Sequence, residues 1–131
     1  MMDSDKTLFC QSYNISIRDI NYGKHLDHLA LLNYLHETRV RYLNSLGVSE
    51  LNVDGINSGL VVTELNCKYR KECFYGDLIE VKLSTKRASQ TRLNFIYHIY
   101  REGILAAEAV ITTAFISNEH KIIPIPNNLL T

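Results

Sequence analysis

One long stretch of helical periodicity, followed by runs that alternate with period two, most constrains how this chain can fold. Between positions 28 and 46, side chains able to pack in a core recur at helical spacing on one face. They are Leu31, Leu35, Thr38, Tyr42 and Leu46, with Leu32 and Leu43 beside them. Asp27 stands at the N-cap position, and Gly47 follows as a C-terminal stop. We therefore predict one helix of about five turns, whose apolar stripe needs a sheet to pack against.

Runs of alternating apolar and polar residues predict the strands of that sheet. Four such runs follow the helix, at residues 61–69, 78–85, 91–100 and 104–117. The breaks between them carry turn residues, and the step Glu102-Gly103 is a short-hairpin signal because glycine accepts a positive φ. We expect the last three strands to form an antiparallel meander.

The two ends of the chain complete the predicted fold. Residues 13–18 supply a short strand ahead of the helix. The tail IIPIPNNLLT holds both prolines and is expected to run extended over the surface or over a neighbouring subunit. The sequence thus predicts an α+β fold in a single domain, residues 1–131, with one central helix wrapped by an antiparallel sheet of about five strands.

Charge and cysteine content exclude several functions. Fourteen basic residues balance 14 acidic ones, so no overall field attracts the chain to nucleic acid or to an anionic membrane. The first residues lack the basic and apolar regions of a signal peptide, and no apolar run approaches membrane-spanning length, so we expect a cytoplasmic protein. The three cysteines have no zinc or redox spacing, and His25 and His28 lack a clear third ligand. We predict neither a metal nor a cofactor.

The segment before the helix carries a recognisable pattern. It reads Asp19-Ile20-Asn21-Tyr22-Gly23-Lys24-His25-Leu26-Asp27-His28 and continues to Tyr34 and to His36-Glu37-Thr38-Arg39. This resembles the signature D-x-D-x-x-G-H-V-N-N, a later Tyr and E-E-A-R of the hotdog-fold acyl-CoA thioesterase superfamily (4-hydroxybenzoyl-CoA thioesterase-like). Further along, Tyr69-Arg70 ends a strand and Tyr75-Gly76-Asp77 precedes the next, much as in the Y-R and G-D region of that family. The resemblance covers nearly the whole chain.

The resemblance implies a hotdog fold and a substrate that is an acyl group on coenzyme A or on acyl carrier protein (ACP). It also implies a homo-oligomer, dimer or tetramer, with sheets joined edge to edge and active sites at the subunit interface. The implied substrate-binding residues are Tyr22, Gly23, His28, Tyr69 and Arg70. The phosphates of coenzyme A need local cations, which two clusters could supply. These are Lys68, Arg70 and Lys71, or Lys86, Arg87 and Arg92.

Thioester hydrolysis needs a carboxylate, as general base or nucleophile, and donors for the oxyanion. The position that usually holds the catalytic second Asp of the family motif is Asn21 here, and an amide cannot act as a base. Two carboxylates could replace it. Asp19 could serve while Asn21 orients water or the carbonyl and His25 polarises it, or Asp27 could serve from the helix start. The implied catalytic set is therefore Asp19, Asn21, His25 and Asp27.

Structural roles compete with these catalytic ones. Asp27 could be only an N-cap, Asp19 could only order the loop, and Asn21 with Gly23 could be turn chemistry alone. Four further polar residues, His36, Glu37, Arg39 and Arg41, are most simply the polar side of the helix. Glu64 interrupts an apolar strand near the helix, and its simplest role is also structural.

Two other functions fit the same residues. A hotdog domain that binds an acyl thioester without hydrolysing it would explain Asn21, and it predicts binding without turnover. A hydratase or dehydratase could use His25 with Asp27 to move a proton beside the thioester carbonyl. No His signature with a long Gly- and Pro-containing stretch supports that second reading. Acyl length and type stay open at this stage.

Overall fold

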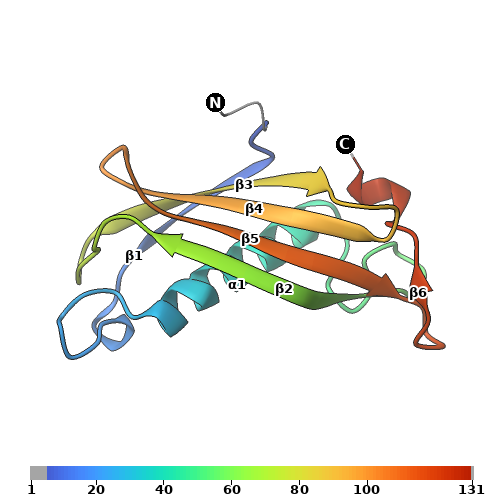
Figure 1. Cartoon of the computed structure of the whole chain (residues 1–131), viewed down its shortest axis with the longest axis horizontal. Coiled ribbons are helices and arrows are strands. Elements are labelled where there is room, and N and C mark those ends of the chain that lie inside the picture. Colours follow the sequence, from blue (N-terminus) through green and yellow to red (C-terminus); the bar gives the residue numbers. More distant parts are fainter. Residues whose placement is uncertain (1–5, 131) are drawn as a thin grey trace.

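A computed structural model describes residues 6–130 of the chain, in which one helix lies across a face of an antiparallel sheet (Figure 1). The strands are β1 (Phe9–Asn14), β2 (Gly59–Tyr69), β3 (Leu78–Arg87), β4 (Arg92–Arg101), β5 (Ile104–Ile116) and β6 (Ile122–Ile123). The helices are η1 (Ile17–Asp19), α1 (His28–Ser45) and η2 (Asn127–Leu129). The strand order is β1-β3-β4-β5-β2, and the short β6 pairs with β5. The predicted α+β fold and the meander of β3, β4 and β5 are confirmed.

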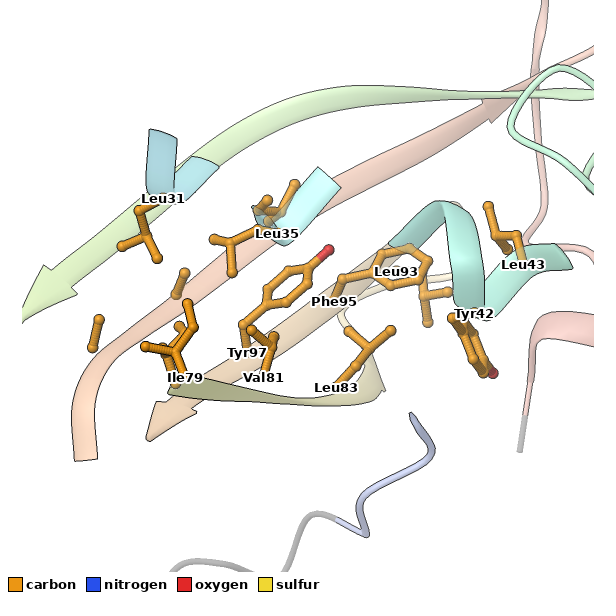
Figure 2. Packing of buried hydrophobic residues seen from close by; sticks show 14 of the residues in the cluster. Leu31, Leu35, Tyr42, Leu43, Ile79, Val81, Leu83, Leu93, Phe95 and Tyr97 are labelled. Carbon is orange, nitrogen blue, oxygen red and sulfur yellow. The ribbon is translucent and has the colours of Figure 1, made fainter. Parts of the chain in front are cut away.

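The core forms where the inward faces of the central strands meet the apolar face of α1. Along β4 every second residue is buried, so that Leu93, Phe95 and Tyr97 all point to the same side. Figure 2 shows Tyr97 of β4 and Val81 of β3 beneath Leu35 of the helix, with Phe95 and Leu93 beside them. The apolar faces of the strands and of the helix therefore pack together in one core, as the sequence predicts.

The helix begins where the capping pattern predicts and ends one residue earlier than the predicted Leu46, just before Gly47. A carboxylate oxygen of Asp27 accepts a hydrogen bond from the backbone N–H of Leu29 at 3.0 Å, and Gly47 has a φ of +80°. One face residue was wrongly assigned: Leu46 is 42% exposed. The helix ends at Ser45, so Leu46 at the C-cap no longer follows the helical periodicity.

Arg39, predicted on the polar side of the helix, is instead buried, with 5% of its surface exposed. Its Nε donates to a carboxylate oxygen of Glu50 at 2.5 Å, and an Nη donates to the hydroxyl of Tyr97 at 3.4 Å. His36 bonds the other oxygen of Glu50 at 2.9 Å. Burial raises the pKa of Glu50, but the bonds from Arg39 and His36 outweigh this and hold it below its ordinary value. The buried cation is therefore fully paired, which is the condition for placing it there.

The first strand lies earlier than predicted. β1 spans Phe9–Asn14 rather than residues 13–18, and it pairs antiparallel with β3, with Tyr13 opposite Ile79. The strand stops because Ser16 and Asp19 form a capping box around η1: the Ser16 N–H and hydroxyl both donate to Asp19. The alternation of residues 13–18 suggested a strand, but the local hydrogen bonds of Ser16 and Asp19 end it at Asn14.

The C-terminal tail packs on the core of its own chain, contrary to the prediction that it runs extended over the surface or over a neighbouring subunit. Ile123 pairs with Phe115 through β6, and the side chains of Ile125 and Leu129 are buried. The side-chain amide of Asn128 donates to the carbonyl of Val53 at 2.8 Å, which ties the tail to the segment after α1. Apolar residues next to the prolines explain the difference, because they are more stable in the core than in water.

β2 is an edge strand of the sheet, and a bulge separates Val62 from Glu64. Glu64 is exposed, and the large apolar side chains of Val62, Leu65 and Tyr69 are also about half exposed. Cys67 is partly buried against the core. A long edge with exposed apolar side chains is a surface suited to pairing with another chain.

Candidate active site

The segment before α1 folds back on itself as a tight turn. The N–H of Asn21 donates to the carbonyl of His25 at 3.0 Å, and the N–H of Lys24 donates to the carbonyl of Asn21 at 2.9 Å. The side-chain oxygen of Asn21 accepts from the N–H of Gly23 at 2.9 Å, which is an Asx turn. Lys24 adopts a φ of 67° to close the turn. The turn therefore places Asn21 and His25 opposite each other on its two arms.

This turn is joined to the connection between β2 and β3, a segment far away in the sequence. An isolated bridge pairs His25 with Phe74, and the N–H of Leu26 donates to the carbonyl of Cys73 at 2.7 Å. The N–H of Asp27 donates to the carbonyl of Asp19 at 2.8 Å. Residues 70–77 therefore lie against the family motif, at the end of the molecule where α1 begins (Figure 1).

A cavity of about 320 Å³ lies between these two segments. Five predicted site residues line it: Asn21, His25, His28, Tyr69 and Arg70. Its polar wall is completed by Lys71, Glu72 and Cys73, and its apolar wall by Leu26, Leu31, Ile99, Ala106 and Ala107. An apolar pocket with a few convergent polar groups is the usual form of a small-molecule site.

His25 is held by three neighbours in this cavity. Its Nε2 lies 2.9 Å from a carboxylate oxygen of Glu72, and the ring packs edge-on against Phe74 with 6.3 Å between centroids. Gly23 lies directly against the ring, so that a Cβ at position 23 would stand 2.5 Å from His25 Nε2. Gly23 is thus needed for the position of the imidazole rather than as a wall of the cavity.

Tyr69 and Arg70 place a neutral hydroxyl and a positive charge, respectively, at the cavity rim. Burial raises the pKa of Tyr69 to about 12, with further contributions from Cys67 and from the charge of Asp27, so its hydroxyl stays a neutral donor. Arg70 donates to Glu108 from Nη2 at 2.7 Å and from Nε at 2.9 Å. The guanidinium is half exposed, and it provides a cation beside the cavity.

Asp19 lies in a different cavity, of about 350 Å³, together with Tyr13, Tyr34 and Arg41. Its Oδ2 accepts hydrogen bonds from the Ser16 N–H at 3.1 Å, the Ser16 hydroxyl at 2.8 Å and the Tyr34 hydroxyl. Partial burial raises the pKa of Asp19, but these bonds and the charge of Arg18 outweigh it, so the pKa lies below its ordinary value. The structure does not bring Asp19 together with Asn21 and His25 in one cavity.

Two other predicted site residues also lie away from the cavity wall. The carboxylate of Asp27 caps α1, and its second oxygen is 3.8 Å from Nδ1 of His28. Tyr22 is fully exposed at the tip of the turn. Asp27 therefore orients the start of the helix, whereas Tyr22 is available at the surface.

The residues that sequence reasoning missed are Glu72 and Cys73, together with the apolar wall. Glu72 lies two residues after the recognised Tyr69-Arg70 pair, so a carboxylate close to a family motif was a usable signal. Nothing in the local pattern of residues 70–74 indicates the bridge to His25, because that contact is set by the pairing of distant segments.

Within residues 6–130, no group of three or more His, Cys, Asp and Glu side chains could hold a metal ion. No helix in that part of the chain is both long and apolar enough to cross a membrane.

One helix packed on an antiparallel sheet in this strand order is a hotdog fold, and comparison with known proteins gives the family. Residues 15–131 match the model of the family described as "Thioesterase-like superfamily". Because the match spans most of the chain, the protein belongs to this superfamily.

Individual relatives agree with that assignment. A protein of Aquifex aeolicus (strain VF5) named "Putative esterase" is 29% identical over 103 residues, which cover 79% of this chain and 80% of the relative. The crystal structure of a hypothetical protein from Aquifex aeolicus has a TM-score of 0.84 at 25% identity, covering 93% of this chain and 96% of that one. A 1,4-dihydroxy-2-naphthoyl-CoA thioesterase from Synechocystis shares the fold, with a TM-score of 0.81 at 22% identity over 92% and 90% of the two chains.

Proposed function

We propose that this protein hydrolyses an acyl-CoA thioester, or the same acyl group on ACP, to a free acid and a thiol. The observation that carries the proposal is the 320 Å³ cavity, where an apolar wall meets polar residues of the family motif. Membership in a thioesterase-like superfamily supports the reaction class. The activity named for the Synechocystis protein, a 1,4-dihydroxy-2-naphthoyl-CoA thioesterase, supports coenzyme A as the thiol and an aromatic acyl group among the candidates.

The thioester carbonyl would lie near the start of α1, because His28 is the first residue of the helix and lines the cavity. Backbone N–H groups and the helix dipole at this end favour the negative charge that develops on the carbonyl oxygen. The side chain of Asn21, the imidazole of His25 and the neutral hydroxyl of Tyr69 can donate hydrogen bonds to the same region. Asp27 and Asp19 hold the loop in shape through the bonds described above.

Binding of the substrate would use both walls. The acyl group would contact Leu31, Ile99 and the alanines of β5, while cations at the rim would meet the phosphates of coenzyme A. Of the two basic clusters, the one formed by Lys68, Arg70 and Lys71 is favoured, since Arg70 and Lys71 line the cavity. The other cluster lies at the opposite ends of β3 and β4 from Asp77 and the cavity.

We also propose that the protein acts as a homodimer, or as a tetramer built from dimers, with β2 joined edge to edge. Exposed apolar side chains along β2 support this, and Tyr69 on that strand also lines the cavity. A second subunit would therefore lie beside the site. We also propose that the protein is cytoplasmic.

A non-catalytic domain that binds acyl thioesters is the second candidate. The specific observation in its favour is that Asn21, an amide engaged in an Asx turn, replaces the usual acidic residue of the motif. This reading needs the same cavity and the same ligands. It differs in predicting saturable binding without product.

The test is release of free thiol from a panel of short, long and aromatic acyl-CoAs, with the corresponding acyl-ACPs as a second set. We expect turnover of at least one member at a rate that depends linearly on protein concentration. Calorimetric binding without any turnover across the panel would replace the proposal with the binding-domain reading. Sedimentation velocity on the same sample would check the oligomer, and a monomer at working concentration would contradict the edge-to-edge arrangement.

A further inference from the structure

We propose that Glu72, from the connection between β2 and β3, is the general base of this site. The inference rests on the proposed thioester hydrolysis and names the carboxylate for it. Glu72 lies outside the family motif in the sequence. The juxtaposition of Glu72 with His25 across two segments of the fold is what assigns the role.

Among residues 6–130, Glu72 is the only carboxylate that lines the 320 Å³ cavity. The other carboxylates nearby are engaged elsewhere. Asp19 accepts three hydrogen bonds in the second cavity, Asp27 caps α1, and Glu108 is paired with Arg70. A base must reach the reacting water, so position in the cavity decides between them.

The carboxylate of Glu72 is both held and accessible. Nε2 of His25 lies 2.9 Å from Oε2 of Glu72, which leaves Oε1 to accept a proton from water. The Glu72 side chain is 62% exposed, so water reaches it from the cavity mouth. His25 is in turn fixed by Gly23 and Phe74. His25 is thus a positioning residue for Glu72 as well as a donor toward the cavity.

The proposed step balances without any co-reactant. Glu72 takes a proton from water as the water oxygen bonds to the thioester carbonyl carbon, and the carbonyl electrons move to oxygen. When the oxyanion collapses, the carbon–sulfur bond breaks, and the leaving thiolate takes the proton from the Glu72 carboxyl. The products are the carboxylic acid and the thiol, and Glu72 returns to its carboxylate form.

The experiment compares Glu72→Gln with wild type in thiol release, using the best acyl-CoA of the panel. Loss of a general base lowers kcat by about 100-fold or more, while calorimetric binding of coenzyme A should change less than about threefold. Glu119→Gln, an exposed glutamate in the turn after β5, is the matched control and should keep wild-type kcat. In Glu72→Ala, added formate should restore part of the turnover, which a merely structural role of Glu72 would not allow.

The outcomes separate this inference from the proposed function. If wild type turns over and Glu72→Gln keeps more than about a third of kcat, Glu72 is not the base, although thioester hydrolysis stands. The same conclusion follows if only Asp19→Asn or only Asp27→Asn abolishes turnover. If wild type releases no thiol from any substrate, the proposed function fails first. Far-UV circular dichroism of each variant checks that the exposed substitution leaves the fold intact.

Discussion

Two cavities flank the loop that leads into α1, and the carboxylate in each differs in hydrogen bonding and in exposure to solvent. In the cavity of Tyr13 and Tyr34, Asp19 is enclosed by three hydrogen-bond donors. In the cavity of Asn21 and His25, Glu72 has one imidazole partner and remains open to solvent. Asp19 of the motif thus makes three local hydrogen bonds, whereas Glu72, outside the motif, lines the cavity of His25.

The electrostatics of the Asp19 cavity point the same way. A carboxylate whose pKa is held low, as that of Asp19 is, gives up its charge reluctantly and is a weaker base. We therefore propose that the loop has a structural side, with Asp19, and a chemical side, with His25 and Glu72.

After the Glu72 substitution, the largest effect should come from Gly23→Ala, which disturbs only the chemical side. The new Cβ would stand 2.5 Å from His25 Nε2, so the ring has to move away from its place beside Glu72. Small misplacements of this kind cost large factors in rate. We expect kcat/KM for thiol release to fall about tenfold or more, with unfolding by urea nearly unchanged.

Gly59→Ala is the matched control for that substitution. Its Cβ would meet its nearest neighbour at 3.6 Å, an ordinary contact, so kcat/KM should stay within about twofold of wild type. Equal activity of Gly23→Ala and Gly59→Ala would show that the position of the imidazole is unimportant.

A moderate effect is expected from Asp19→Asn, and it should appear in stability rather than in turnover. Weakening the capping box and the bond from Tyr34 should lower the free energy of unfolding by about 1 kcal/mol. Thiol release should stay within about twofold of wild type, since Asp19 lies outside the cavity of His25. Urea unfolding and the thiol assay measure the two sides separately, and a collapse of turnover at full stability would reverse the comparison.

The stability difference between wild type and Asp19→Asn should also depend on pH. The folded-state pKa of Asp19 is lowered from its ordinary value of 3.8. The stabilisation is therefore present above that value and is lost as the pH falls through the lower folded pKa. Urea midpoints between pH 3 and pH 7 should converge at the acid end, and a gap that does not change with pH would contradict this.

The smallest effect is expected at the charged rim of the Asp19 cavity. Glu37 and Arg41 form an i,i+4 pair at 2.7 Å, and both side chains are half exposed. Such pairs contribute about 0.3–0.5 kcal/mol. A double-mutant cycle with Glu37→Gln and Arg41→Gln, followed by urea unfolding at low and high salt, should give a coupling in this range that weakens with salt. A coupling above about 1 kcal/mol would mean that the Glu37–Arg41 pair belongs to the structural side of the loop, with Asp19.

Most of the helix and strand positions of this chain could be predicted from local sequence patterns. Apolar spacing predicted α1 and four of the strands, and the residue types at positions 27 and 47 predicted its two ends, because capping and periodicity depend on neighbours within one turn. The predictions failed where a distant segment intervenes. Arg39 is buried because Glu50 and Tyr97 meet it there, and the tail packs inward because the core offers Ile125 and Leu129 a place.

The site divides along the same line. The sequence by itself determined the family motif and the polar residues Asn21, His25, His28, Tyr69 and Arg70, all of which line one cavity. Only the tertiary structure decided which carboxylate joins them. The bridge between His25 and Phe74 draws Glu72 to the imidazole, while the capping box turns Asp19 into the other cavity. Residue type can be read from the chain, but the direction in which a carboxylate points depends on hydrogen bonds between segments that meet only in the folded protein.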